Sequence, residues 1–315
     1  MNSIFLFVGL VTIVTSPFVW WRLDNDIPSA RFLTSHEKVQ AIERLRANQT
    51  GTGTREFKLS HVLELVLEPK TYLFIGMTLL LNLGAQVSNT FGPLILAGFG
   101  FDPYKTSLLN IPFGVLQFLA ILAGSYAAYK SRFKSLILAT FMLPVIAGIA
   151  LLYALPRTHN EQARLMVGFY LFAFLFAGNP LIVAWIVANT GGATKKSVIM
   201  ACYQGASSAG NIIGPLLFKS DQAPAYHPGL RDVLGVFVAL VAVVFIQLAN
   251  LIVLNRIQQK KRVANGKQAI LKDHSMEDHY VGYGEENETG EGPKLGEGAF
   301  LDLTDRKNDE FVYVY

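Results

Sequence analysis

Seven stretches of apolar residues follow one another along the chain, each long enough to form a membrane-spanning helix. A helix needs about 20 apolar residues to cross the hydrocarbon core of a bilayer. None of the seven stretches contains Asp, Glu, Lys, Arg or His. The pattern therefore predicts an all-α membrane protein with seven transmembrane helices, at about residues 4–21, 71–97, 106–129, 135–155, 165–188, 197–218 and 233–255.

The polar segments divide this chain into four regions. The first helix (1–21) is followed by a long loop (22–70), a six-helix unit (71–255) and a tail (256–315). In the loop, Thr34 and Glu37 form a T-x-x-E capping box that predicts a helix over about 35–47. Two interpretations of this helix remain open: it lies on the cytosolic face of the membrane as an amphipathic helix, or it is an ordinary solvated linker helix. The tail is rich in Gly, Asp and Glu, which predicts that it is mostly disordered.

Composition and charge support a membrane protein and give its orientation. Only 16% of the residues are charged, against about 25% in soluble domains, and the mean hydropathy is +0.35. These values argue against a soluble enzyme and a nucleic-acid binder. Of the 27 Lys and Arg residues, 22 lie in the alternate loops and tail that include 22–70, which predicts that these segments and the C-terminus are cytosolic. The first span has no preceding basic residue and ends in Trp20 and Trp21, unlike a cleaved signal peptide.

Polar side chains within the second predicted span share one helical face. Asn82, Gln86 and Asn89 have the spacing i, i+4, i+7, and Gly92–Pro93, which follow them, predict a break or a kink of the helix. Amide side chains at membrane depth need a protein or water partner, because hydrocarbon offers none. A polar stripe that ends at a break is typical of transporter sites, and we interpret it as a cavity lining. Interhelical hydrogen bonding is the structural alternative.

Two further spans carry similar combinations of amide, small and proline residues. In the fifth span, Gly178–Asn179–Pro180 precede Trp185, which fits either stacking on a planar solute or core packing. In the sixth span, Gln204 and Asn211 are cavity candidates, whereas the glycines are better suited to close helix approach. The helix-break or gating candidates are Gly92, Pro93, Gly178, Pro180, Gly210, Gly214 and Pro215.

Several kinds of chemistry have no residues to support them in the predicted spans. Without a carboxylate or His, these spans offer no internal proton relay, catalytic group or metal site. The ATP-binding motif G-x-x-x-x-G-K-[ST] is absent from the sequence, so this chain does not itself use ATP to drive transport. The sequence therefore predicts no enzyme activity, no cofactor and no metal.

Three segments of the chain resemble a known family. They are PSARFLT at 28–34 with Glu37 and the ERLR run at 43–46, WIVANTGG at 185–192 with Lys195 and Lys196, and GNIIGP at 210–215. In order and spacing they resemble the fungal anion:cation symporters, the allantoate-permease-like branch of the major facilitator superfamily. The similarity covers about residues 4–255.

The resemblance implies a partial major facilitator fold, with the seven helices similar to spans 6–12 of twelve. It implies proton-coupled symport, by alternating access, of small organic anions such as allantoate, ureidosuccinate, vitamins or short peptides. The expected protein is a multi-pass plasma-membrane transporter that needs the missing N-terminal half, with the lipid bilayer, a substrate anion and a proton as partners and no nucleic acid. Its cavity candidates are Asn82, Gln86, Asn89, Asn179, Trp185, Tyr203, Gln204 and Asn211.

Two alternatives remain open from the sequence. The chain could be a truncated membrane product that does not transport. It could also be a seven-helix receptor, although an extracellular Cys pair is absent, because Cys202 is the single cysteine, and the first inner loop is long.

Overall fold

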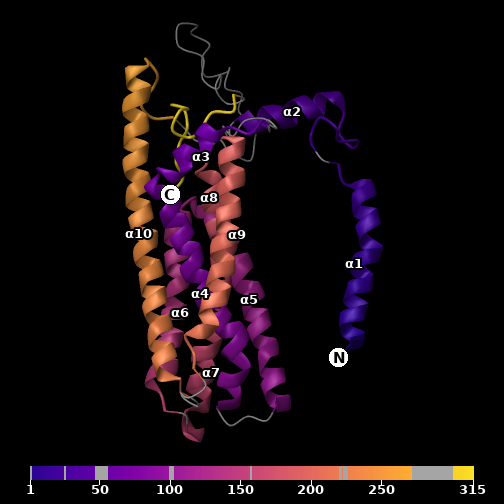
Figure 1. Ribbon diagram of the computed structural model, residues 1–315, viewed down its shortest axis with the longest axis vertical. Coiled ribbons are helices and arrows are strands. Elements are labelled where there is room, and N and C mark those ends of the chain that lie inside the picture. The colour runs from indigo at the N-terminus through magenta and orange to yellow at the C-terminus, as the bar shows by residue number, and fades with distance from the viewer. Residues whose placement is uncertain are drawn as a thin grey trace.

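The computed structural model describes residues 2–24, 26–46, 56–98, 103–156, 158–219, 222, 226–271 and 301–315, with the backbone alone for 2–4, 43–46, 86–98, 103 and 159. Every regular element in these ranges is a helix. The longest helices run side by side in one bundle, and the ordered C-terminal segment lies at one end of it (Figure 1). The all-α prediction is confirmed for these ranges.

The apolar runs expected after the first loop form helices of the bundle, whereas the count of seven spans stays a prediction. Five described helical stretches of the chain are long and apolar enough to cross a membrane: 5–22, 104–131, 134–154, 162–188 and 227–264. The two remaining predicted spans correspond to α4 and α9, which run along the bundle with the others (Figure 1). The bundle elements are α4 (Pro69–Gly98), α5 (Pro103–Ser131), α6 (Lys134–Ala154), η1 (His159–Glu161), α7 (Gln162–Leu171), η2 (Phe172–Ala177), α8 (Gly178–Ala188), α9 (Ala193–Leu216) and α10 (His227–Ala264).

The first helix, α1 (Asn2–Arg22), stands apart from the bundle (Figure 1). Large apolar side chains are exposed along it, including Phe5 at 73% and Trp20 at 86% of their surface. Removing apolar surface from water contributes about 25 cal/mol per Å² to stability. A helix with this much exposed apolar surface therefore requires lipid or protein around it.

Two short helices connect α1 to the bundle. The first, α2 (Ser35–Arg46), confirms the predicted helix and its capping box. The backbone N–H of Thr34 donates to the Glu37 carboxylate at 2.8 Å, and the N–H of Glu37 donates to Thr34 Oγ1 at 3.3 Å. The second helix, α3 (Leu59–Val66), lies at the same end of the bundle as the C-terminus (Figure 1).

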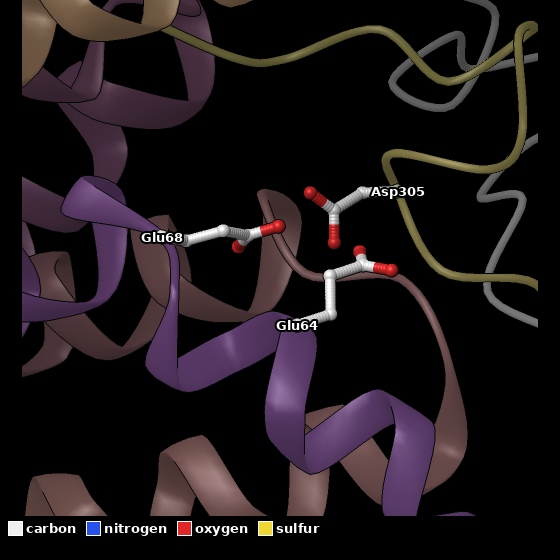
Figure 2. Close-up of side chains that lie close together, drawn as sticks. All are labelled: Glu64, Glu68 and Asp305. Carbon is white, nitrogen blue, oxygen red and sulfur yellow. The ribbon is translucent and has the colours of Figure 1, made fainter.

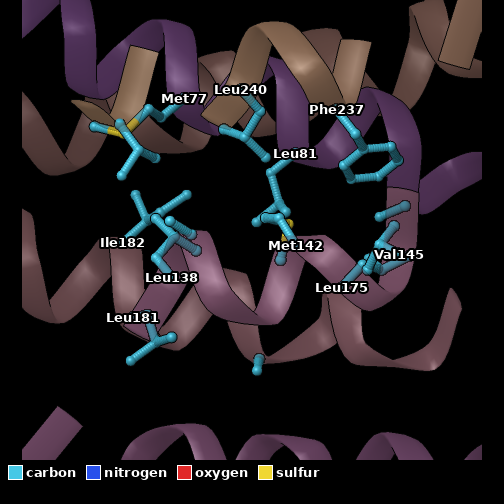
Figure 3. Close-up of a cluster of buried hydrophobic side chains, with 14 of the residues drawn as sticks. Met77, Leu81, Leu138, Met142, Val145, Leu175, Leu181, Ile182, Phe237 and Leu240 are labelled. Carbon is cyan, nitrogen blue, oxygen red and sulfur yellow. The ribbon is translucent and has the colours of Figure 1, made fainter. Parts of the chain in front are cut away.

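The core of the bundle is formed where α4 contacts α6, α8 and α10. Met77 and Leu81 of α4 meet apolar side chains from these helices, and all are fully buried (Figure 3). At Gly210, α9 approaches α4 so closely that a Cβ would lie 2.7 Å from the carbonyl oxygen of Leu79. Small residues let two membrane helices bring their backbones together in this way.

The fifth predicted span changes helix type in its middle. The 3₁₀ segment η2 separates α7 from α8, and α8 begins at Gly178. Pro180 has no N–H to donate to the carbonyl of residue 176, four positions earlier, which favours a change of helix type there. By contrast, α4 remains helical through Gly92 and Pro93 to Gly98, so the helix does not break there, and the alternative of a kink stays a prediction.

The tail differs from the expectation of a mostly disordered segment. Residues 256–264 continue α10, and residues 301–315 lie against the end of the bundle with Phe311 and Tyr313 buried. These two aromatic side chains give the segment apolar surface to bury. The prediction of disorder rests on the overall acidic composition and does not take them into account. Residues 272–300 lie outside the described part of the chain.

Candidate functional site

Three of the predicted cavity residues meet inside the bundle, from three different helices. Asn82 of α4 and Asn179 of α8 exchange amide hydrogen bonds of 3.2 and 3.3 Å. The hydroxyl of Tyr203 on α9 donates to Asn179 Oδ1 at 3.2 Å. Asn82 also donates to the carbonyl of Thr78 at 2.8 Å. The cluster thus links the helices that carry it, and its polar atoms could exchange these bonds for bonds to a solute.

The other predicted cavity residues have different surroundings. Trp185 is fully buried: its ring meets Phe74 edge-on at 5.4 Å, and its Nε1–H donates to the carbonyl of Val314 at 2.8 Å. This arrangement is core packing, one of the two interpretations that the sequence left open. Gln204 is exposed and Asn211 is half-buried on α9. The side chains of Gln86 and Asn89 lie outside the described part of the chain.

Two of the helix-break candidates, Gly178 and Gly210, lie at contacts between helices. Gly178 faces Leu81, whose side chain would be 2.7 Å from a Cβ. Gly210 and Gly214 are buried, and Gly210 contacts the α4 backbone. Pro180 is exposed, and Pro215 precedes the last residue of α9. Their role in gating stays a prediction. The same holds for Gly92 and Pro93, for which only the backbone is described.

A second buried polar cluster lies at the end of the bundle where the C-terminal segment binds. The Lys195 ammonium donates to Glu64 at 2.9 Å, to Glu68 at 2.7 Å and to Asp305 at 2.8 Å. Figure 2 shows these three carboxylates turned toward one another, two from the α3 region and one from the tail. Lys70 also donates to Asp305. We call Glu64, Glu68, Lys70, Lys195 and Asp305 the charged cluster.

Burial and neighbouring charge act in opposite directions within the charged cluster. Burial alone would raise the pKa of Asp305, but Lys70 and Lys195 outweigh it and hold this pKa well below 3.8. For Glu68 burial prevails over the same lysines, and the pKa is raised above 4.5. Burial would lower the pKa of Lys195, but Asp305 and Glu68 raise it. Asp305 and Lys195 therefore remain a charged pair at neutral pH.

Three carboxylates this close could in principle hold a metal ion. Their ligand atoms lie within 4.8 Å of one another. However, the Lys195 ammonium binds one oxygen from each of the three carboxylates and occupies the place of a cation. The donor set therefore does not fit a metal while Lys195 is in place.

Sequence reasoning missed the charged cluster, because its members are far apart in the chain. Lys195 and Asp305 are separated by 110 residues, and Lys70 and Asp305 by 235. In the sequence, Lys195 stands out only as part of the family resemblance, after WIVANTGG, and nothing there indicates its acidic partners. The run FVYVY at 311–315 combines aromatic and β-branched residues, which are typical of extended segments, and this run is the signal that the sequence offers.

The long apolar helices and the buried polar groups between them define an integral membrane protein that crosses the bilayer several times. The chain is similar over nearly its whole length to fungal transporters. It is 34% identical to the MFS-type transporter cnsL of Penicillium expansum over 98% of the chain and 58% of that protein. It is 30% identical to the thiamine pathway transporter THI73 and 28% identical to the allantoate permease, both of Saccharomyces cerevisiae, over 99% of the chain and 54% of each.

The chain is thus a relative of MFS-type transporters, and it spans about half the length of the curated relatives it matches. These relatives are named as transporters or a permease, and none of the three is named as an enzyme. No protein-family model matches the chain. No solved structure matches it either.

Proposed function

We propose that this chain forms the C-terminal half, with one additional helix, of a secondary transporter that carries small organic anions across the plasma membrane. Transport would proceed by alternating access and proton symport. The names of the allantoate permease and the other relatives support a carrier of small solutes. The multi-pass helical bundle supports a carrier that works within the bilayer.

The observation that carries this proposal is the linkage of Asn82, Asn179 and Tyr203. Their polar atoms come from α4, α8 and α9 and meet among the apolar side chains of the bundle core. Buried amides with exchangeable partners can bind a polar solute and then return to each other, so they suit a site that must both hold and release it.

A complete carrier needs groups that this polar cluster does not supply. An anionic solute favours a cation in its site, and proton symport needs a titratable group. The charges of the charged cluster lie at the end of the bundle and are already paired. We therefore expect the solute's cation and the proton carrier to come from the half that the chain does not span. The exposed apolar surface of α1 suits packing against that half.

The proposal is tested by uptake in yeast cells that lack their own anion carriers. The chain is expressed alone and fused behind the part of cnsL that the match leaves uncovered. The fusion should take up at least one radiolabelled carboxylate, ureide or vitamin saturably, and a protonophore should abolish uptake. The chain alone should not transport. A fusion that reaches the plasma membrane but takes up none of the panel would contradict the proposal.

Variants of the fusion test the polar cluster itself. Asn82→Ala or Asn179→Ala should lower uptake about tenfold, since one lost hydrogen bond of about 1.4 kcal/mol corresponds to that factor. The matched control is Asn250→Ala, because Asn250 on α10 bonds only to Gln247 of its own helix among the bonds described, at 3.3 Å. Unchanged uptake by the first two variants would assign the cluster to helix packing instead.

A further inference from the structure

The C-terminal segment binds the bundle through side chains that recognise its backbone. Asn255 of α10 accepts from the N–H of Tyr313 and donates to its carbonyl, both at 2.8 Å. Asn189, at the end of α8, accepts from the N–H of Val314 at 2.8 Å and donates to its carbonyl at 3.0 Å. Two amides thus hold two successive residues as a neighbouring strand would, in a way that does not depend on the side chains of the segment.

The charged cluster adds recognition of one side chain. Asp305 is fully buried and receives hydrogen bonds from Lys70, Lys195 and the N–H of Gly191, and from the hydroxyl of Tyr313 at 2.8 Å. If the segment leaves, both ammonium groups lose this carboxylate. Hydrogen bonds between ionised groups are about twice as strong as neutral ones, so Asp305 should dominate specificity.

The turn between α8 and α9 is shaped to admit the segment. Gly191 has no side chain, and a Cβ there would lie 2.6 Å from the backbone nitrogen of Asp305. Gly192 adopts a φ of +90°, a conformation that L side chains rarely take. The N–H of Ala193, in the first turn of α9, donates to Asp302 at 2.7 Å. Acidic groups are favoured at this end of a helix.

Apolar contact and further backbone bonds complete the interface. Phe311 and Tyr313 are 3% and 2% exposed, and their rings meet at 5.1 Å. The Arg262 guanidinium, near the end of α10, donates to the carbonyl of Asp309 at 2.9 Å. The segment itself contains no helix, so its order depends on the bundle rather than on its own structure.

We propose that the end of the bundle formed by the α3–α4 junction, the α8–α9 turn and the last turns of α10 is a peptide-binding site. Its ligand is the chain's own C-terminal segment, residues 301–315. The site takes an extended, acidic and aromatic peptide, with the Asp305 carboxylate between Lys70 and Lys195 as the anchor. Because the bonds lie between a segment and a separate bundle, the segment can leave and rebind as a unit.

Hydrogen–deuterium exchange of the full chain in detergent micelles tests whether the site is occupied. The amides of Tyr313 and Val314 should be protected relative to a free peptide of residues 301–315. Asp305→Asn should speed their exchange about 30-fold or more, the factor expected when one partner of a buried charge pair is removed. Gly191→Ala should also speed the exchange of these amides, because the added methyl group on the bundle would clash with the backbone of Asp305.

Matched controls separate loss of docking from loss of the fold. Asp232→Asn changes an exposed carboxylate at the start of α10, and Gly205→Ala changes a glycine with open space around it. Both should leave tail exchange unchanged, and the amides of α6 should stay protected in all variants. Exchange of the wild-type tail at free-peptide rates would overturn the proposal without reference to any variant.

Binding in trans tests whether the site is separable. A fluorescent peptide of residues 301–315 should bind saturably to the full chain carrying Asp305→Asn, whose own tail competes poorly. The same peptide with Asp305→Asn should bind about 30-fold more weakly. Absence of saturable binding by the wild-type peptide would overturn the proposal of a peptide site.

Discussion

At the scale of single residues, glycines decide how closely the helices approach. Gly210 and Gly205 lie on the same helix, α9, but only Gly210 contacts α4, where Leu79 and Leu83 offer backbone atoms that cannot move aside. Gly205 has nothing near its missing side chain. The pair therefore separates the effect of helix contact from the intrinsic effect of glycine in a helix.

Gly210→Ala should destabilise the bundle by about 1–3 kcal/mol, because the added methyl group forces α9 away from α4. Gly205→Ala should instead stabilise it by roughly 0.5–1 kcal/mol, since alanine loses less conformational freedom in a helix. Unfolding in mixed micelles with increasing SDS, followed by circular dichroism, measures both. Equal effects of the two substitutions would contradict the contact at Gly210.

At the scale of elements, the sequence predicts the helices well and their partners poorly. Long apolar runs define α1, α5, α6 and α10, and the Thr34–Glu37 pair defines where α2 begins. These are local signals. The contact of Asp305 with Lys195 is not local, because no spacing rule connects residues so far apart. Asn82 and Asn179 could be recognised as polar residues within apolar helices, but their pairing required the structure.

The C-terminal segment should respond to acid through Asp305. Its pKa in the bound segment lies below the ordinary 3.8, so the released segment takes up a proton more readily. Binding is therefore complete above pH 3.8 and weakens as the pH falls through the pKa of the bound state. Glu68, whose pKa burial raises, acts in the opposite sense. The other groups facing Asp305 or Glu68 are Glu64, Lys70, Lys195, Tyr313 and Arg306.

A nitroxide label at the exposed Lys307, introduced as Lys307→Cys in a Cys202→Ser background, should report this release. We expect restricted motion from pH 7 to pH 5 and increasing motion below pH 3.8, with helical circular dichroism retained. The same label with Asp305→Asn should be mobile throughout. Increased motion already between pH 7 and pH 5 would contradict the assignment of Asp305 as the titrating anchor.

At the scale of the whole molecule, orientation is the property that charge alone predicts. Residues 301–315 and α3 lie at one end of the bundle, and the C-terminal end of α9 and the start of α10 lie at the other (Figure 1). The Lys and Arg residues of the alternate loops and tail that include 22–70 predict that the end with α3 faces the cytosol. The seven-span count, the missing half and the substrate remain predictions at this scale.

An epitope joined after Tyr315 through a flexible spacer should be detected by antibody only in permeabilised cells. An epitope inserted after Gln222, between α9 and α10, should be detected on intact cells. Immunofluorescence of both tagged proteins in the same strain provides the comparison. Surface staining of the first epitope on intact cells would reverse the orientation.

The amide clamp of Asn189 and Asn255 has a consequence for how this segment can change during evolution. Because the clamp holds the main-chain atoms of Tyr313 and Val314, we expect the side chain of Val314 to be replaceable by other residues. The number of residues between Asp305 and Tyr313 is constrained, because their side chains are hydrogen-bonded to each other. One inserted residue would move either the carboxylate or the phenol out of this contact. In related proteins this stretch should therefore tolerate amino-acid substitutions far better than insertions or deletions of single residues.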